Sequence, residues 1–229
     1  MRNFEIFWTR FTSPGHFRNF LIGLQNTAEI AVFGFLIGLF LGCLLSTIQI
    51  IPGKNIFVTI LKRIIDVYVA VFRGTPMVVQ LLLFHYGIFA TVIIPPVMEA
   101  ALIFGLNSAA YMTEIIRGGI NSVDKGQLEA GRAVGLGFGT TMVRIVIPQA
   151  IKNVVPTLGN ELISLLKETS IVSFIALVDL TKALKNIADS TYEYFVPYIA
   201  LAIVYLVIVI ILTVIIKLIE RRLRRSDKR

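Results

Sequence analysis

Five apolar segments, each about long enough to cross a lipid bilayer, constrain this chain more than any other feature. The clearest is residues 195–216, which contain no charged side chain. About 20 apolar residues are enough to cross the hydrocarbon core as a helix, which bonds all its own backbone groups. We therefore predict an all-α integral membrane protein with five transmembrane helices. The other four lie near residues 27–48, 64–90, 98–116 and, after Pro148 and Pro156, up to 178.

The overall composition supports a membrane location. Of the 229 residues, 56% are hydrophobic and 16% are charged, which is too little polarity to cover a soluble globule. The net charge of +8 could suggest nucleic acid, but seven of the positive residues lie within residues 217–229, directly after an apolar segment. A basic cluster in that place is typical of contact with anionic lipid headgroups. We expect membrane lipid as a partner and no nucleic acid.

The sequence offers no basis for catalysis or metal binding. Cys43 is the single cysteine, and His16 and His85 are far apart without acidic neighbours at ligand spacing. No phosphate-binding P-loop occurs, because the nearest fragment, residues 52–55, lacks the first glycine and the hydroxyl that holds magnesium. We expect no catalytic residue, no metal and no cofactor in this chain.

Basic residues predict the orientation and the domain limits. They are concentrated in three regions, and these alternate correctly across a membrane when the amino terminus lies outside and the carboxyl terminus in the cytoplasm. Residues 1–20 mix aromatic with basic side chains, as in an amphipathic helix lying in the membrane interface, and turn residues break this pattern at 12–15. We predict an interfacial helix at 1–20, a transmembrane domain at 21–219 with a cytoplasmic loop at about 122–150, and a basic tail at 220–229. The three basic regions are residues 54–63, 117–152 and 217–229.

Small and polar residues mark the faces of these segments that avoid lipid. Glycines at every fourth position of the first segment allow another helix to approach closely. A charge and a proline interrupt the second segment, and polar groups share one face of the third and of the fourth, so these faces point toward other helices or water. The residues are Gly34, Gly38 and Gly42; Arg73 and Pro76; Asn107, Tyr111 and Glu114; and Asn160, Glu161, Ser164, Lys167 and Glu168.

A polar, glycine-rich stretch at residues 127–148 separates the third apolar segment from the fourth. It reads E-A-G, three residues, G, nine residues, then I-V-I-P. This pattern resembles the E-A-A, x3, G, x9, I-x-L-P cytoplasmic loop of permease subunits of bacterial ABC importers, with Gly131 in place of the second alanine and Ile147 in place of the leucine. The stretches FRGTPMVVQ (72–80) and KETSIVSFIALVDL (167–180) resemble the polar amino acid subfamily, which includes histidine, glutamine and arginine permeases.

The resemblance implies the membrane-spanning subunit of an importer for polar amino acids in the bacterial inner membrane. It further implies a separate ATPase subunit that binds ATP and magnesium, an extracytoplasmic binding protein and a second permease subunit, for which we expect a second copy of this chain. In that family the loop forms short helices that dock on the ATPase. The docking positions would be Glu129, Ala130, Gly131, Gly135, Ile145 and Pro148.

Polar groups within the apolar segments are the candidates for substrate contact. An amino acid that leaves water needs protein groups to replace the solvent around its carboxylate and ammonium. Glu161 has no fixed cation one turn away, which favours a basic substrate such as arginine, with glutamine second. The alternative is that Glu161 pairs with Lys167 or Arg73 and holds helices together. The candidates are Arg73, Asn107, Tyr111, Asn160, Glu161 and Ser164.

Two other functions compete with that of an importer. In a passive ion or solute channel, the polar faces of the third and fourth segments would line a pore, and no docking loop would be needed. In a scaffold subunit of a membrane complex, the charged residues within the segments would have no purpose. Co-purification with an ATP-binding protein discriminates among the three.

Overall fold

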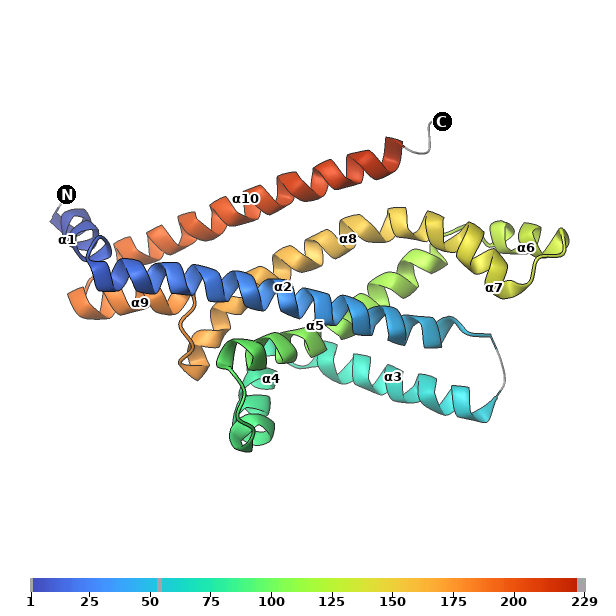
Figure 1. Ribbon diagram of the computed structural model, residues 1–229, viewed down its shortest axis with the longest axis horizontal. Coiled ribbons are helices and arrows are strands. Elements are labelled where there is room, and N and C mark those ends of the chain that lie inside the picture. Colours follow the sequence, from blue (N-terminus) through green and yellow to red (C-terminus); the bar gives the residue numbers. More distant parts are fainter. Residues whose placement is uncertain (1, 53–54, 226–229) are drawn as a thin grey trace.

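The computed structural model describes residues 2–52 and 55–225, and in these ranges it contains helices and turns but no strand (Figure 1). This confirms the predicted all-α class. The elements in chain order are α1 (Arg2–Phe11), α2 (Pro14–Ile50), α3 (Ile56–Gly74), α4 (Met77–Leu83), η1 (Phe84–Ile88), η2 (Phe89–Thr91), α5 (Pro96–Asn121), α6 (Lys125–Ala133), α7 (Phe138–Thr141), η3 (Met142–Val146), α8 (Ile147–Glu168), η4 (Thr169–Ile175), α9 (Leu180–Thr191) and α10 (Phe195–Arg225).

The long helices run along the length of the molecule, with short helices at its two ends and α4 projecting to the side between them (Figure 1). Figure 1 shows α1 and α9 at one end, and α6, α7 and the end of α10 toward the other. The α2–α3 connection reaches the same end as α6 and α7. The described parts of the three basic regions therefore lie toward one end of the molecule, as the predicted topology requires. Lys54 and residues 226–229 fall outside the described residues.

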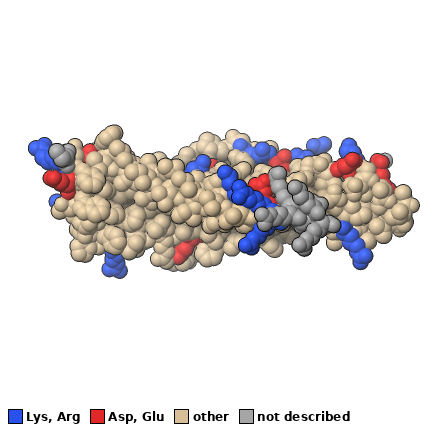
Figure 2. Space-filling model, turned by 90° about the horizontal axis from the view of Figure 1, so that it is seen from above, with Lys and Arg blue, Asp and Glu red and all other residues tan. Residues whose placement is uncertain are grey.

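The surface between the two ends is mostly uncharged. Figure 2 shows Lys and Arg side chains gathered near the end of α10 and at the amino-terminal tip, with uncharged residues over much of the face between them. Residues 195–223 of α10 are highly apolar, and none of the residues in the most apolar part of this stretch is buried. This helix presents its apolar side chains outward, as expected for the segment most exposed to lipid.

The amino-terminal helix α1 is an amphipathic element that packs on α9. Phe7 is buried against Leu184 and Ile187 of α9, and Thr12 and Ser13 separate α1 from the helix that follows. Pro14 begins α2, where its missing N–H costs nothing because the first N–H groups of a helix have no intrahelical partner. The break predicted at residues 12–15 therefore lies at the start of α2.

The glycine face of α2 is the centre of the fold. Gly38 and Gly42 lie directly against Ser108 and Met112 of α5, and a Cβ atom on Gly38 would be 2.8 Å from the Cβ atom of Ser108. A real Cβ atom does not fit at that distance, so glycine is required for the two backbones to approach this closely. The predicted close contact is present, and its partner is α5.

The second apolar segment is not one crossing helix as predicted for residues 64–90. The chain ends α3 at Gly74 and turns so sharply that the following segment lies at 108° to it. Thr75 is extended, at φ −119° and ψ 145°, as residues before a proline usually are, and Pro76 cannot continue the hydrogen-bond ladder. Kinking was expected from Pro76, but the bend makes this segment either a broken span or a re-entrant loop.

The fourth segment also differs from the prediction of one helix up to residue 178. Helix α8 contains Pro156 inside it and ends at Glu168. A 3₁₀ turn follows and ends at Ala176, which has the left-handed φ of 60°. The chain therefore changes direction before residue 178, and a buried polar residue, Asp179, begins the next helix.

By length and apolar composition, two described helices could each cross a membrane, namely α2 and α10. The bent pair of α3 with residues 77–91 would make a third. Helices α5 and α8 are 26 and 22 residues long but carry the polar faces described above. The count of five spans stays a prediction.

Candidate functional site

The polar loop folds into two short helices at one end of the molecule. Asp124 begins the first of them, α6, and its Oδ1 atom accepts a hydrogen bond from the Gly126 backbone N–H at 2.8 Å. An aspartate at this position satisfies an otherwise unpaired N–H and complements the positive end of the helix dipole. The short helices expected from the resemblance are therefore α6 and α7.

Gly135 ends α6 through its backbone conformation. Its φ of +86° lies in the left-handed region, which glycine adopts without steric penalty. The Gly135 N–H donates to the Arg132 carbonyl and the Leu136 N–H to the Gly131 carbonyl, at 3.0 and 3.1 Å. These two bonds form a Schellman motif. The glycine of the loop pattern, Gly135, therefore lies where α6 ends and the chain changes direction.

Gly131 is a packing position. A Cβ atom there would lie 2.4 Å from Cγ2 of Thr141 in α7, and Thr141 is buried and bonded to the Gly137 carbonyl at 3.1 Å. The alanine expected from the loop pattern would collide unless Thr141 moved. The glycine in this chain is thus matched to the threonine opposite it.

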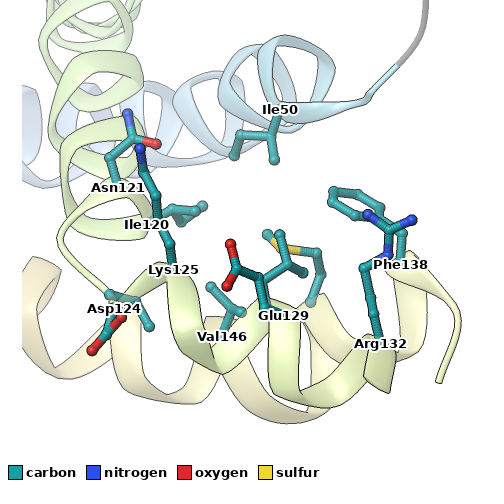
Figure 3. Close-up of a pocket in the computed structure, with 12 residues that line it drawn as sticks. Ile50, Ile120, Asn121, Asp124, Lys125, Glu129, Arg132, Phe138 and Val146 are labelled. Atoms are coloured by element: carbon teal, nitrogen blue, oxygen red, sulfur yellow. The ribbon is translucent and has the colours of Figure 1, made fainter. Parts of the chain in front are cut away.

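The other predicted docking positions lie on or near the surface. Glu129, Ala130, Gly135 and Pro148 are exposed, and Ile145 is partly exposed. Beside them is an open hollow of about 740 Å³ between α6, α7, the end of α5 and the end of α2. Figure 3 shows Lys125, Glu129 and Arg132 rising from α6 toward Ile50 on α2. Charged side chains thus border a hollow with apolar walls.

The candidate Asn107 is occupied inside the protein. It is buried, and its Nδ2 atom donates to Oε1 of Gln80 at 2.8 Å. The Gln80 Nε2 atom in turn donates to the Phe72 carbonyl at 2.8 Å and to the Thr75 hydroxyl at 2.7 Å. Gln80 satisfies backbone and side-chain groups beside the bend, and Asn107 holds Gln80 in place. Sequence reasoning did not identify Gln80, although its position four residues after Pro76 was visible.

Arg73 and Tyr111 form a second cluster beside the same bend. The Arg73 guanidinium lies over the Tyr111 ring, 5.4 Å from the ring centroid, and 3.5 Å from Oε2 of Glu114. The same carboxylate oxygen accepts a hydrogen bond from Arg117 at 2.7 Å. Arg73 therefore pairs with Glu114 of the neighbouring helix α5 and not with Glu161. Arg73 and Tyr111 remain partly exposed.

Helix α8 presents a row of exposed polar side chains, which we call the α8 stripe. Its members follow one another at three- or four-residue intervals and so share a face. A polar, exposed face on a helix of a membrane protein points toward water or another protein rather than lipid. The α8 stripe consists of Asn153, Thr157, Asn160, Ser164 and Lys167.

Glu161 lies beside the α8 stripe, half-buried between α8 and α5. One of its oxygens accepts a hydrogen bond from the Ser108 hydroxyl at 2.9 Å. Among the described residues no Lys or Arg forms an ion pair with Glu161. The arrangement is a carboxylate held in position by one neutral donor. Ser108, which also packs on the glycine face of α2, was not identified from the sequence because its partner is 53 residues away.

Two acidic residues accept hydrogen bonds in α9: Asp179 at its start and Asp189 toward its end. Asp179 is buried and accepts hydrogen bonds from the backbone N–H groups of Thr181 and Lys182 at 3.0 and 2.8 Å. Burial raises the pKa of the Asp179 carboxyl, and these two N–H groups oppose the change. At the surface, a 2.7 Å bond from Lys185 lowers the pKa of Asp189.

Comparison with known proteins finds one matching family and several similar sequences. The sequence pattern of the family described as binding-protein-dependent transport system inner membrane component matches residues 34–225. The arginine transport system permease protein ArtQ of Bacillus subtilis is 42% identical over 209 residues, which cover 90% of this chain and 93% of that protein. A putative glutamine transport system permease protein GlnP of Rickettsia bellii is 39% identical and covers 88% and 91%.

Solved structures of ABC transporters also resemble this chain. The crystal structure of an amino acid ABC transporter with histidines matches with a TM-score of 0.82 and 38% sequence identity, covering 91% of this chain and 95% of that one. Inward-facing MetNI, a methionine ABC transporter, matches with a TM-score of 0.66 at 22% identity, which supports the fold alone.

Proposed function

Because this chain belongs to the family of binding-protein-dependent transport system inner membrane components, and is the permease subunit of an amino-acid ABC importer, we propose that its substrate is a basic amino acid. Arginine is the first choice and glutamine the second. The chain is a transport subunit and not itself an enzyme. A passive channel or a scaffold would not account for its membership of this family.

The isolated Glu161 carboxylate carries this proposal. A carboxylate taken partly out of water is costly unless a cation or several donors compensate it. Glu161 has the single Ser108 donor and no ion pair within the described chain. A guanidinium or ammonium group on a passing substrate supplies the missing charge. The names of two relatives, which specify arginine and glutamine transport, are consistent with this ranking.

The proposed translocation route follows the α8 stripe. Asn160 and Ser164 are exposed and offer hydrogen bonds to a polar substrate, with Glu161 beside them. Arg73 and Tyr111 are partly exposed and remain candidates, although Glu114 already balances much of the Arg73 charge. Asn107 would act indirectly by holding Gln80 at the bend.

The loop at α6 and α7 is the proposed docking surface for a separate ATPase subunit that binds ATP and magnesium. Glu129, Ala130 and Pro148 would contact that subunit directly, with Ile145 beside them, whereas Gly131 and Gly135 would shape the loop. Closure of two ATPases would draw two such loops together and switch the permeases between inward and outward states. An extracytoplasmic binding protein would deliver the amino acid in a bacterial inner membrane, with the amino terminus outside and the carboxyl terminus in the cytoplasm.

The test is transport by Glu161→Gln in proteoliposomes that contain the ATPase and the binding protein. We expect arginine uptake to fall about tenfold or more relative to glutamine uptake, because a hydrogen-bonded charge contributes roughly 1.5 to 3 kcal/mol. Ser108→Ala is the matched control: it removes the donor but keeps the charge, so it should affect both substrates to a smaller and similar extent. Equal losses for arginine and glutamine in Glu161→Gln would assign Glu161 a structural role and refute the preference for basic substrates.

A further inference from the structure

The α8 stripe ends beside a cavity that the proposed function does not use, whose lining is mostly apolar but includes several polar groups. This cavity has a volume of about 370 Å³ and lies between the end of α8, the start of α9 and the first half of α10. Lys167 and Ser170 form one wall, Thr181 a second, and Tyr198 and Tyr205 a third. One cation and four hydroxyl groups from four elements, α8, η4, α9 and α10, thus line one space.

These groups have unused hydrogen-bonding capacity. Lys167 is exposed and forms no ion pair with any residue in the described ranges. The Tyr205 hydroxyl and the Thr181 Oγ1 atom are buried near each other, and neither makes a hydrogen bond of good geometry with any residue in the described ranges. Asp179 forms no ion pair with this lysine in the described ranges, and its two oxygens accept from the backbone at the start of α9. Buried polar groups left unpaired are uncommon and point to a missing partner.

We propose that this cavity is the subsite for the α-carboxylate of the transported amino acid, with Lys167 as its cation. This rests on the proposed transport of amino acids along the α8 stripe. A carboxylate has two oxygens that each accept more than one hydrogen bond, and an ammonium group with nearby hydroxyls supplies such donors. Lys167 belongs to the α8 stripe, so its charge borders the same route as Asn160 and Ser164.

A neighbouring acid makes an amino acid a better fit than a simple anion. Glu168 follows Lys167 in the chain, is exposed, and interacts electrostatically with it without forming an ion pair. A phosphate or a lipid headgroup phosphate would be repelled by this carboxylate. An amino acid carries an ammonium group on the same carbon as its carboxylate, so both Lys167 and Glu168 find an opposite charge.

The separation between Lys167 and Glu161 fits a basic substrate. Six helical positions correspond to about 9 Å along the axis, which is comparable to the length of an extended arginine or lysine. The carboxylate at Lys167 therefore leaves the side-chain cation within reach of Glu161, with Ser164 between the two. Six positions also turn the helix by about 600°, so Glu161 lies about 120° around α8 from Lys167, and the substrate would cross Ser164 to reach it.

The experiment measures equilibrium binding to the purified permease–ATPase complex in lipid nanodiscs, without the binding protein, which would impose its own selectivity. The probes are arginine and agmatine, which is arginine without its carboxylate, and glutamine and 4-aminobutanamide, which are related in the same way. In the wild type, each amino acid should bind at least tenfold more tightly than its decarboxylated analogue. Lys167→Gln should remove that difference in both pairs by weakening the amino acids alone, and Lys167→Arg should largely restore it.

Lys182→Gln is the matched control, because it removes a positive charge from α9 at a position that does not line the cavity. It should leave unchanged the ratio between the affinity of each amino acid and that of its decarboxylated analogue. Ratios that stay at the wild-type value in Lys167→Gln would overturn the carboxylate subsite, as would a wild type that does not distinguish the amino acids from their analogues. Glu161→Gln separates the two proposals: if it affects arginine and glutamine alike while Lys167→Gln still abolishes both ratios, the basic-substrate proposal fails and the carboxylate subsite stands.

Discussion

Single residues of the α6–α7 loop derive their importance from backbone geometry rather than from side-chain chemistry. Gly135 has open space around the position of a missing Cβ atom, so bulk alone would be tolerated there. Its φ of +86° is what other residues rarely adopt. The loop pattern was recognisable in the sequence, but the reason for its glycine became visible only with the backbone angles.

Gly135→Ala should therefore disturb the loop without preventing membrane insertion. The left-handed conformation costs about 1 to 2 kcal/mol for a residue with a Cβ atom, and the end of α6 would fray or shift. We expect substrate-stimulated ATP hydrolysis by the reconstituted complex to fall several-fold. Gly135→Asn is the matched control, because asparagine enters the left-handed region more readily than alanine, and it should retain more activity. Similar activity in Gly135→Ala and wild type would show that the conformation of this turn does not matter for coupling.

Among whole elements, the bend between α3 and α4 is the largest departure from expectation. Arg73 and Pro76 signalled an interruption, but a proline alone does not specify a bend of 108°. Gln80 and Asn107 satisfy groups at residues 72 and 75 beside the bend, and we expect the angle to depend on them. Such a network joins side chains that are 27 residues apart, and no local pattern reports it.

Other elements were predictable because their signals are local and periodic. The glycines of α2, at every fourth position, correctly indicated a close helix contact. The end of α8 at Glu168 was missed, since residues 169–178 are as apolar as a helix interior. The sequence left open whether Glu161 pairs with Lys167 or Arg73, and its Ser108 donor depends on how α5 and α8 pack.

Gln80→Leu tests whether this bond network sets the bend. Leucine has a similar size but leaves the Asn107 side chain and the groups at residues 72 and 75 without their bonds. We expect a loss of stability of about 1 to 3 kcal/mol, the usual effect of leaving a buried polar group unpaired, measured as a lower midpoint of thermal unfolding in detergent. Arginine and glutamine uptake should decline in parallel, because Gln80 acts on the fold and not on substrate charge.

Val79→Leu is a suitable comparison, since Val79 is exposed on the same short helix and makes no such bonds. Its unfolding midpoint should match that of the wild type. A Gln80→Leu protein that unfolds at the wild-type temperature would mean that Thr75 and Pro76 alone are sufficient for the bend.

The whole molecule is an incomplete transport route by itself. The α8 stripe is polar and exposed along its length, and a polar face cannot be left against lipid tails at an acceptable free energy. One chain supplies a single wall of the proposed route, so we expect a second subunit to cover the stripe and enclose that route. The sequence contains nothing that demands a non-identical partner, and a second copy would bring two stripes, two Lys167 cavities and two docking loops to one assembly.

We therefore predict that the permease is a homodimer. When the chain is expressed with one ATPase and purified, native mass spectrometry should detect a particle with two copies of each. Copies carrying two different affinity tags should also be recovered together, because a homodimer contains both tags in about half of its particles when expression is equal. Purification in the presence of a homologous permease that carries a third tag provides the control for a mixed pair. A stable, transport-competent particle with one copy of this chain, or one that forms only with the homologue, would contradict the homodimer, because a single α8 stripe would then be closed by a different surface.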